Sequence, residues 1–435
     1  MSSNRDKYTQ EQLDKYTQEQ LDLIDKALTA QQCKDQDMDI SISVKWWGYT
    51  VQLNQKAVFK LDLCLTYLEE KLGLHFKGEI LTLISFCIQL KQRRLENAVN
   101  AEGSDGYVRL ISPWVIPFAL TVVKGSSGDD RNLWFTVWDP DQKQWGQQAE
   151  FHECLSRNAP ALAQHGDLLY CVHRGDTSDL LKWSVYSTND GWSDDHDFPR
   201  HWTETNPSLV EFNKTLYCFH RGAGNDQALY YCTFNTASKT WNNDIMIKVG
   251  DQVQYSKSGC AVAVFNEELH MVYQSGSSND IYHRIFNKDT NAWRRSSIEP
   301  NASTKDTPAL VAYGTNLLLV HRGDGDEFIW YCTYNGNSWT KEQQIPGMYS
   351  SMGPGLAVFG NEVFMVHRSN KSNGELYYSI YNGSSWSPDA HIDGQSTGAP
   401  PALACYTDPQ CIPANYTDSK TAEPRLICVH RGWGT

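Results

Sequence analysis

Two segments of the chain decide the fold, Leu168-Leu-Tyr-Cys-Val-His-Arg-Gly175 and Thr215-Leu-Tyr-Cys-Phe-His-Arg-Gly222. Related copies occupy residues 317–323, 363–369 and 426–432, and a degenerate copy at 269–275 has Tyr-Gln-Ser where the others have His-Arg. The His position, or its Tyr substitute, falls at 173, 220, 273, 321, 367 and 430. Self-similarity at a period of about 20–50 residues is typical of repeat architectures.

Each repeat contains further strand signals around the His-Arg segment. A short apolar stretch such as residues 159–162 precedes it, and an aromatic stretch such as residues 181–186 follows it. A turn then leads to a lone tryptophan, at Trp145, Trp192, Trp241, Trp293, Trp339 and Trp386. Four short, aromatic and β-branched strands per repeat are typical of a β-propeller blade. The chain is therefore predicted to be mainly β.

The two ends of the repeat region predict the number of blades. The last copy stops just after its second strand, whereas the first recognisable piece, residues 132–145, supplies a third and a fourth strand. Joining them gives a closing blade shared between residues 130–150 and 399–435, which removes exposed sheet edges. Six blades result. Residues 118–125 resemble one more second strand, which leaves a seventh blade open.

The N-terminal quarter of the chain differs from the repeats. We predict a polar helical extension over residues 1–37 and a small α+β module over 38–115, with a helical hairpin at 55–72 and 78–97. The propeller is then expected to occupy residues 116–435.

Composition and charge restrict the classes of partner. The 38 basic and 51 acidic residues give a net charge of −13, with no basic stripe, so nucleic acid is not an expected partner. The polar N-terminus lacks the apolar core of a secretory signal. Cytoplasmic synthesis is therefore expected, with release by a non-classical route as an open alternative. Most cysteines replace apolar core residues and are expected to be reduced, while pairing of Cys405 with Cys411 stays open.

The residues at the end of the second strand are the candidate binding residues. One interpretation is a ring of sugar sites, because guanidinium and carboxylate groups bind hydroxyls and an aromatic face covers the C–H patch of a sugar ring. The other is that these groups brace the loop after the second strand. The candidates are His173, His220, His321, His367 and His430; Arg174, Arg221, Arg322, Arg368 and Arg431; Asp179, Asp226, Glu327 and Glu375; and Trp183, Tyr230, Trp330, Tyr377 and Trp433.

Catalysis is the least favoured interpretation of these residues. An active site needs unique residues in one pocket, whereas repetition predicts several similar sites. No metal-ligand, nucleophile-elbow or phosphate-loop motif is present, so no cofactor and no metal is predicted. The acidic cluster of Asp194, Asp195 and Asp197 around His196 is interpreted as a solvated loop. The turns before the lone tryptophans are interpreted as structural, with each indole packed between blades.

Residues 130–435 resemble the six-bladed propeller lectins of fungi and bacteria, of which the fucose-binding group is the best known. The resemblance rests on the blade length, the Arg that ends the second strand, the aromatic third strand and the split closing blade. It implies that an Arg, an acidic residue and a Trp or Tyr hold a sugar between adjacent blades. In this sequence a Glu after the Arg occurs only as Glu327 and Glu375, so the likeness is architectural.

Two further resemblances concern shorter segments. Residues 187–192, Ser-Thr-Asn-Asp-Gly-Trp, resemble a shortened Asp box of sialidases. Residues 44–48 and 108–114 resemble small Trp-Trp-Gly modules attached to lectin-like domains in toxin-like microbial proteins. The second resemblance implies a targeting propeller beside a module that contacts membranes.

Together these observations predict a multivalent carbohydrate-binding protein that is not an enzyme and whose partners are glycans. A sialidase-like glycoside hydrolase is the first alternative, and a propeller that binds other proteins is the second.

Overall fold

The computed structural model describes residues 40–45, 48–54, 107–113, 121–124, 130–187, 191–407 and 424–433. The chain divides into two compact units, Met1–Ser126 and Ser127–Thr435. The predicted N-terminal extension and the helical hairpin at 55–72 and 78–97 lie outside the described residues. Within the described residues, no helix has the length and apolar character needed to cross a membrane.

The first unit contains one antiparallel sheet in the order β1-β2-β3-β4. Its strands are β1 (Ile40–Lys45), β2 (Gly48–Asn54), β3 (Tyr107–Pro113) and β4 (Thr121–Lys124). Because β4 pairs with β3, with Ile111 opposite Thr121, it belongs to this sheet and not to a propeller blade. The alternative of a seventh blade built from residues 118–125 is therefore wrong, and the division between the units falls later than residue 115.

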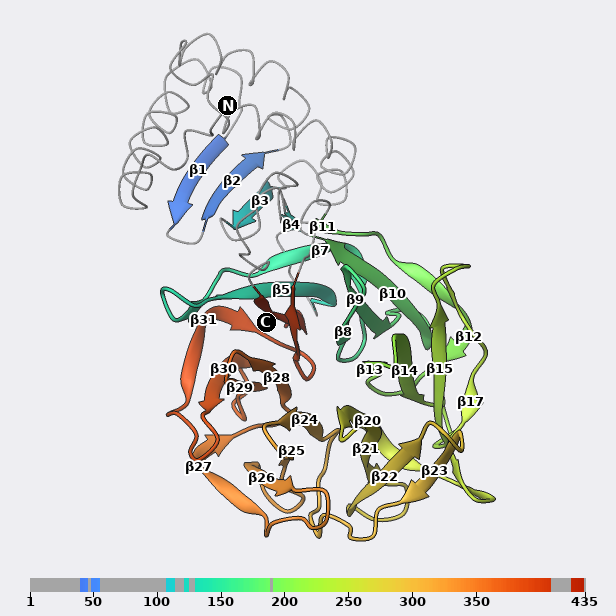
Figure 1. Ribbon diagram of the computed structural model, residues 1–435. Helices are drawn as coiled ribbons and strands as arrows, with labels where there is room; N and C mark the ends of the chain where they lie inside the picture. Colours follow the sequence, from blue (N-terminus) through green and yellow to red (C-terminus); the bar gives the residue numbers. More distant parts are fainter. Residues whose placement is uncertain are drawn as a thin grey trace, which may run out of the picture. The chain divides into compact units, whose positions relative to one another are not determined.

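The second unit is a β-propeller of six antiparallel sheets around a central axis, as the sequence predicts (Figure 1). Blades 1, 2 and 4 each consist of four or five consecutive strands. In blades 1 and 2, two outer strands both pair with the third strand. Blade 1 is β8 (Ala161–His165), β9 (Leu168–Arg174), β10 (Leu180–Ser187), β11 (Gly191–Trp192) and β12 (His196–Trp202); blade 2 is β13 (Ser208–Phe212), β14 (Thr215–Arg221), β15 (Leu229–Asn235), β16 (Thr240–Trp241) and β17 (Ile245–Met246); blade 4 is β24 (Ala309–Tyr313), β25 (Asn316–Arg322), β26 (Phe328–Tyr334) and β27 (Gln343–Tyr349).

Blade 3 carries an insertion that explains its longer repeat. The hairpin of β18 (Lys248–Val249) and β19 (Gln252–Val253) joins the edge of its sheet through β23. The remaining strands of blade 3 are β20 (Ser256–Phe265), β21 (Glu268–Ser275), β22 (Ile281–Asn287) and β23 (Ala292–Arg295); blade 5 is β28 (Gly355–Phe359), β29 (Glu362–Arg368), β30 (Glu375–Tyr381) and β31 (Ala390–Ser396).

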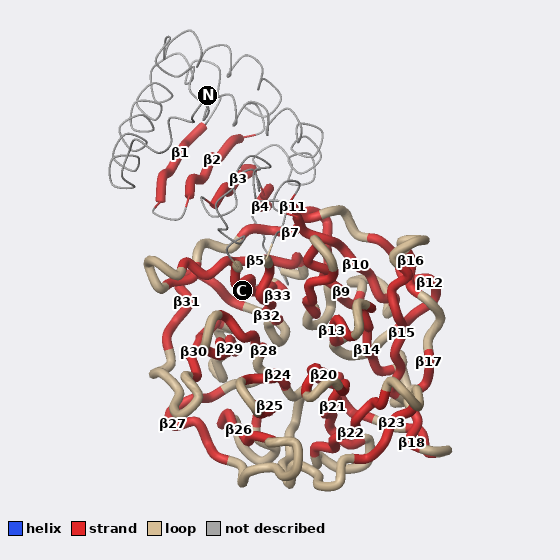
Figure 2. Tube along the Cα trace, viewed as in Figure 1, coloured by secondary structure: helices blue, strands red, loops and turns tan. Residues whose placement is uncertain are grey.

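Blade 6 closes the ring with strands from both ends of the propeller. It combines β32 (Ala402–Tyr406) and β33 (Arg425–Arg431) with β5 (Asn132–Asp139), β6 (Gln144–Trp145) and β7 (Ala149–Leu155). Strand β33 pairs antiparallel with β5, with His430 opposite Trp134. The innermost strands contact one another in ring order, from β8 through β13, β20, β24, β28 and β32 back to β8. Figure 2 shows these strands around the axis.

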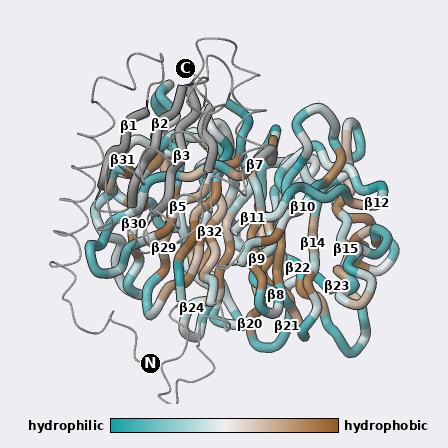
Figure 3. Tube along the Cα trace, turned by 90° about the horizontal axis from the view of Figure 1, so that it is seen from above, coloured by the Kyte–Doolittle hydropathy of each residue, from teal (hydrophilic) through white to brown (hydrophobic). Residues whose placement is uncertain are grey.

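The sheets of adjacent blades pack against each other through layers of apolar side chains. Between blades 1 and 2, for example, Val172 and Leu181 pack with Trp241 in one buried cluster. Apolar residues follow the strands, and polar residues follow the loops that connect them (Figure 3). The lone tryptophans belong to these layers: Trp192 stacks on Phe151 of the preceding blade at 4.0 Å, and Trp241 stacks on Phe198 at 4.6 Å. The structural interpretation of these tryptophans is confirmed.

The cysteines of the repeats are buried within the same layers. Cys171, Cys218 and Cys428 lie on the second strands, and Cys232 and Cys332 lie on the third strands. All five are free thiols, as expected. Cys411 is outside the described residues, so its pairing with Cys405 stays a prediction.

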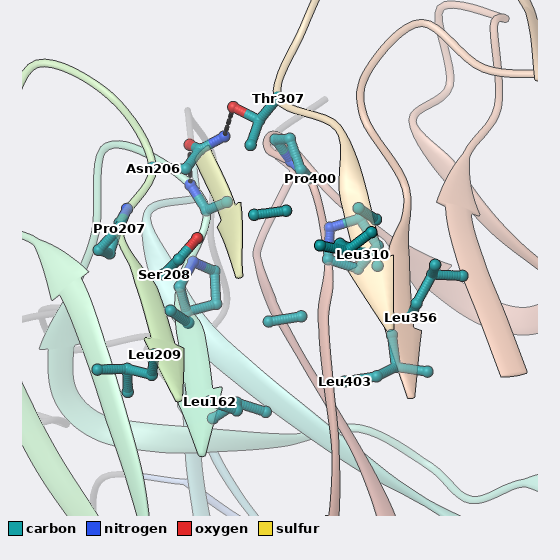
Figure 4. Close-up of a pocket in the computed structure, with 18 of the residues that line it drawn as sticks. Leu162, Asn206, Pro207, Ser208, Leu209, Thr307, Leu310, Leu356, Pro400 and Leu403 are labelled. Atoms are coloured by element: carbon teal, nitrogen blue, oxygen red, sulfur yellow. Dashed lines mark hydrogen bonds between the residues drawn. The ribbon is translucent and has the colours of Figure 1, made fainter. Parts of the chain in front are cut away.

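The axis of the propeller holds a narrow cavity of about 130 Å³. Every blade contributes small residues and one branched apolar side chain, and every blade except blade 3 adds proline from just before its innermost strand; the lining includes Leu162, Leu209 and Leu310 (Figure 4). At one end, Asn206 Nδ2 donates to Thr307 Oγ1 at 3.2 Å. Among the described residues that line this cavity, Cys260 alone is titratable, and burial raises its pKa to about 12. The axial cavity therefore offers no acid-base pair.

Candidate functional site at the blade boundaries

The histidines that end the second strands are buried, with exposed fractions of 1% or less. In four blades Nε2 of this histidine lies beside the carboxylate three residues after the lone tryptophan. The pairs are His173–Asp195 at 2.9 Å, His220–Asp244 at 2.9 Å, His321–Glu342 at 2.9 Å and His367–Asp389 at 3.0 Å. Each pair ties the second strand to the segment that leads into the outermost strand. We call this contact the His-acid brace.

This position corrects the expectation that the histidines contact a ligand. Nδ1 of His173 faces the backbone carbonyl of Arg174 at 3.1 Å, and Nδ1 of His220 faces that of Arg221 at 3.3 Å, so in these two blades both ring nitrogens are engaged within the blade. The acidic cluster near His196 is also not a simple solvated loop. Asp195 serves the brace, and Asp197 accepts a hydrogen bond from Lys182 Nζ at 2.8 Å. The histidines consequently belong to the blade framework.

Two blades lack the acid of the brace. In blade 6, Gln148 stands three residues after Trp145, where the other blades have Asp or Glu. Burial lowers the pKa of His430 to about 4. In blade 3, Tyr273 replaces the histidine and Ser296 replaces the acid, and Tyr273 Oη donates to Gln254 Oε1 at 2.7 Å. Histidine without its carboxylate is thus held in the neutral form.

The buried His430 predicts a pH dependence of folding. Its folded pKa lies below its ordinary value of 6.5, so the unfolded chain binds the proton first, and stability falls as pH drops from about 6.5 to 4. The shift corresponds to a loss of about 3 kcal/mol at most. Urea unfolding at pH 7 and pH 4.5 should show a smaller pH effect for His430→Gln than for the unaltered chain. An identical pH effect in both proteins would contradict this origin.

The five arginines are mostly buried; four lie at the boundary with the next blade, and Arg431 contacts the link that leads into its own blade. Each donates to a backbone carbonyl in a link, which is the segment joining the outermost strand of one blade to the innermost strand of the next. The contacts are Arg174 to Glu204, 3.2 Å; Arg221 to Ser256, 3.1 Å; Arg322 to Ser350, 3.0 Å; Arg368 to Thr397, 2.8 Å; and Arg431 to Gly398, 3.1 Å. The guanidinium groups therefore brace the links, and carboxylates join them in two blades, as Asp179 on Arg174 and Glu327 at 3.7 Å from Arg322.

The register of the third strand decides which aromatic residues are equivalent. Tyr230, Trp330 and Tyr377 stand opposite the second-strand histidines. In blade 1, however, Lys182 stands opposite His173, and in blade 6 Trp134 stands opposite His430. Trp183 is shifted by one residue and packs against Tyr170 and Phe234 between blades.

Trp433 also occupies a different position from the other candidate rings. It follows the second strand of blade 6, and the guanidinium of Arg368 lies 4.6 Å above its ring. Trp183 and Trp433 are therefore not counterparts of Tyr230, and the sequence comparison missed Trp134.

An acidic residue four positions before the ring holds the ring in three blades. Asp226 accepts from Tyr230 Oη at 2.9 Å, Asp326 accepts from Trp330 Nε1 at 3.3 Å, and Asp130 accepts from Trp134 Nε1 at 2.8 Å. Asp326, and not Glu327, is thus the counterpart of Asp226. Burial and the Asp226 carboxylate together raise the pKa of Tyr230 to about 12. The spacing Asp-x-x-x-aromatic is the sequence signal that could have found this contact.

The outermost strands end in exposed rings that sequence reasoning missed. Trp202, Tyr255 and Tyr349 are 48%, 51% and 42% exposed, and Leu155 occupies the same position in blade 6 at 39%. Each stands opposite the beginning of the third strand in its own blade, and each precedes the Ser or Thr that begins a link. We call these four residues the rim residues. In blades 3 and 5 the position that corresponds to the rim residues is occupied by Ser303 and Ser396.

The rim residues lie next to the loop between the second and third strands of the following blade. Glu204, two residues after Trp202, donates its backbone N–H to Gly222 and accepts from the backbone N–H of Gly224 at 3.2 Å. Tyr255 accepts from the backbone N–H of Gly276 at 2.9 Å. A Cβ at Gly276 would lie 2.8 Å from Tyr255 Cβ, so this close approach requires glycine.

A cavity of about 390 Å³ opens at the boundary between blades 2 and 3. Tyr255, Tyr273, Tyr282 and Gln252 line it together with Arg284 and Arg295. Arg284 replaces the small residue at the third-strand position of Cys232 and is buried. It bonds to Glu299 at 2.7 Å and to Gln254 at 2.8 Å, with Tyr282 5.0 Å below the guanidinium. The degenerate repeat has thus exchanged the His-acid brace for an arginine-centred network.

A second hollow of about 580 Å³ lies where the links meet the axis. Arg157, Lys257 and Lys305 line it together with Glu204 and Asp306. Burial raises the pKa of Asp306, but its two oxygens already accept backbone N–H groups, from Thr307 at 2.7 Å and from Gly353 at 2.9 Å. Asp306 therefore holds two links together.

Two groups of side chains have the composition of metal ligands. Cys154, His173 and Asp195 form one at the boundary of blades 6 and 1, and His201, Cys232 and Asp244 form the other at the boundary of blades 1 and 2. Each contains the residue that directly precedes a rim residue, Cys154 before Leu155 and His201 before Trp202.

Comparisons with known proteins return only structural neighbours. No family model and no curated protein matches the sequence. A six-bladed, fucose-recognising lectin of Aleuria aurantia is 12% identical with a TM-score of 0.46, covering 72% of this chain and 93% of that one. AofleA of Arthrobotrys oligospora is 10% identical with a TM-score of 0.47, covering 77% and 88%. An exo-β-1,3-galactanase of Phanerochaete chrysosporium is 12% identical with a TM-score of 0.39, covering 49% and 57%.

A fungal six-bladed propeller lectin is thus among the solved structures that this chain resembles, as the sequence predicts. Such distant neighbours assign neither a ligand nor a site to this chain.

Proposed function

We propose that the propeller is a carbohydrate-binding protein without catalytic activity and that its sites lie at the blade boundaries beside the rim residues. The observation that supports this best is the recurrence of an exposed ring at one strand position, in Trp202, Tyr255 and Tyr349. A ring left half exposed beside hydrogen-bonding groups suits a sugar, since the ring covers the C–H face while polar groups bind the hydroxyls.

Three boundaries have a rim ring close in sequence to a contact with the next blade, and at one of them a second ring from that blade lines the same cavity. Trp202 precedes the loop that carries Asp226 and Tyr230, and Tyr255 lines one cavity with Tyr282. Tyr349 precedes Ser351, whose hydroxyl donates to the backbone of Ser369 in the next loop at 2.9 Å. Leu155, Ser303 and Ser396 offer no aromatic face. The proposal therefore predicts unequal sites, with three stronger ones.

The arginines support the proposed sites indirectly and are not expected to bind the sugar. Their guanidinium groups hold the links next to the rim residues. The carboxylates of Asp226 and Glu375 accept from Tyr230 Oη at 2.9 Å and from Tyr377 Oη at 3.4 Å, and their further lone pairs can accept sugar hydroxyls. Hydrolysis is less well supported, because a glycosidase needs two carboxyl groups free to act on one bond. In the hollow at the axis, Asp306 is already engaged with backbone N–H groups.

A glycan array probed with the full chain tests the proposal. The chain should bind at least one glycan class, and Trp202→Ala, Tyr255→Ala and Tyr349→Ala should each weaken the monovalent affinity at their own site about tenfold, since one ring contact contributes roughly 1–1.5 kcal/mol. The triple variant should lose array binding, because avidity depends on several occupied sites.

Ile245→Ala is the matched control, since Ile245 is equally exposed at 51% but lies at the outer edge of blade 2. It should bind as the unaltered chain does. Absence of binding to any glycan, or unchanged binding by a folded triple variant, would overturn the proposal. Turnover of fluorogenic glycosides would favour the hydrolase alternative, and partner capture without sugar binding would favour a protein-interaction propeller.

A further inference from the structure

The boundary between blades 1 and 2 brings together an imidazole, a thiol and a carboxylate. His201 comes from β12, Cys232 from β15, and Asp244 from the segment before β17. One ligand atom of each lies within 4.8 Å of those of the other two, and His201 Nε2 is 3.2 Å from Asp244 Oδ1. His201 and Cys232 are 1% exposed, whereas the Asp244 side chain is 24% exposed. The group is buried but open to solvent on one side.

Nitrogen, sulfur and carboxylate oxygen are the ligands that Zn²⁺ takes in a tetrahedral site, at about 2.0–2.3 Å. A modest contraction of the three atoms around an ion would reach those distances. The thiolate and the carboxylate together balance the charge of the ion, which makes burial of all three acceptable. Metal binding requires the imidazole to be neutral and the thiol to be deprotonated, so the ion displaces the thiol proton on binding.

His201 and Cys232 are additional to the brace that the other blades share. At the strand position of His201 the other five blades carry Cys154, Gln254, Ala302, Met348 and Gln395. The His220–Asp244 brace is intact at 2.9 Å, and His220 Nδ1 faces the Arg221 carbonyl at 3.3 Å. His220 would therefore orient the carboxylate from behind, as outer partners of metal ligands do.

The other group, at the boundary of blades 6 and 1, has no histidine in addition to the brace histidine. There His173 is itself the brace histidine, with Nε2 on Asp195 at 2.9 Å, so a metal could bind Nε2 only by breaking the brace. Blade 4 has His321, Glu342 and Cys332 in the corresponding places but Ala302 in place of His201. One boundary alone thus combines the brace with two further ligands.

We propose that the boundary of blades 1 and 2 holds a Zn²⁺ ion, bound by His201, Cys232 and Asp244 with water as the fourth ligand. The ion ties the outermost strand of blade 1 to blade 2 through the residue that directly precedes Trp202. Binding releases the proton of the Cys232 thiol to solvent. The site is independent of the proposed carbohydrate binding, since it uses none of the exposed rings.

Titration of the metal-stripped full chain with Co²⁺ tests the site. A reducing phosphine is present, because Cys218 stands opposite Cys232 in the sheet and a disulfide between them would remove the ligand. We expect one Co²⁺ per chain with an intense thiolate-to-metal absorption band, abolished by stoichiometric Zn²⁺. Zn²⁺ should also raise the melting temperature.

Cys232→Ser and His201→Gln should both eliminate the band. The repeats themselves indicate that these variants fold, because Ser184 and Ser379 occupy the position of Cys232, and Gln254 and Gln395 occupy that of His201. Cys332→Ser, at the same strand position in blade 4, is the matched control and should retain the band. His220→Gln should weaken Co²⁺ affinity about 10–100-fold.

Two results would overturn the site: absence of a thiolate band in the unaltered chain, and a band retained by Cys232→Ser. In the second case, loss of the band in Cys154→Ser would assign the metal to the boundary of blades 6 and 1.

Discussion

Replacing Trp241 with alanine is expected to lower the free energy of unfolding by about 3–5 kcal/mol, as large-to-small changes of buried aromatic residues do. Trp241 is 3% exposed, stacks on Phe198 of blade 1 at 4.6 Å and contacts Phe234 of its own blade at 5.2 Å between ring centres. Its removal leaves a cavity between two sheets that backbone pairing on both sides holds in place. Urea unfolding monitored by circular dichroism measures the loss.

Two further variants separate packing from hydrogen bonding. Within the described residues the indole N–H of Trp241 has no hydrogen-bond partner. Trp241→Phe therefore removes side-chain volume but no hydrogen bond, and it should lower the free energy of unfolding by only about 1–2 kcal/mol. Trp202→Ala should change stability by no more than about 0.5 kcal/mol, because its ring is 48% exposed. Equal losses for Trp241→Ala and Trp202→Ala would contradict the distinction between core and rim tryptophans.

Gly353→Ala is expected to destabilise the ring by about 3 kcal/mol or to prevent its closure, the upper end of ordinary overpacking. A Cβ at Gly353 would lie 2.2 Å from the backbone oxygen of Thr307 in the neighbouring link. Neither link can retreat, because the backbone N–H groups of Gly353 and Thr307 both donate to Asp306. Soluble yield and the midpoint of thermal unfolding report the effect.

Gly325 provides the matched control for this substitution. It lies in the exposed loop between the second and third strands of blade 4, where an added Cβ meets nothing within 4 Å. Gly325→Ala should therefore leave the unfolding midpoint unchanged. A Gly353→Ala protein as stable as Gly325→Ala would mean that the links are free to move apart.

Much of the fold follows from local signals that recur along the chain. The His-Arg segments, the lone tryptophans and the two complementary ends predict six four-stranded blades because each repeat carries the same alternation and the same turns. The interpretation of the lone tryptophans as packing residues also needed only their place in the repeat. The role of the arginines was left open between binding and bracing, and the structure places their donors on link carbonyls.

The candidate site depended on registers that the sequence pattern leaves undetermined. The sequence makes Trp183 a candidate platform, yet pairing places Lys182 opposite His173. A shift of one residue turns a side chain to the other face of a sheet. Trp134 stands opposite His430 only because the two ends of the propeller share one blade.

The sequence by itself determined the repeat, the strand order within a blade and the number of blades, because these follow from periodicity and from how the ends complement each other. Only the tertiary structure decided which side chains are buried in the His-acid braces, which rings stay exposed at the rim, and where His201 meets Cys232 and Asp244. The physical reason is that each of these contacts joins different strands, and the last also joins different blades, so it depends on sheet register and blade packing instead of local pattern.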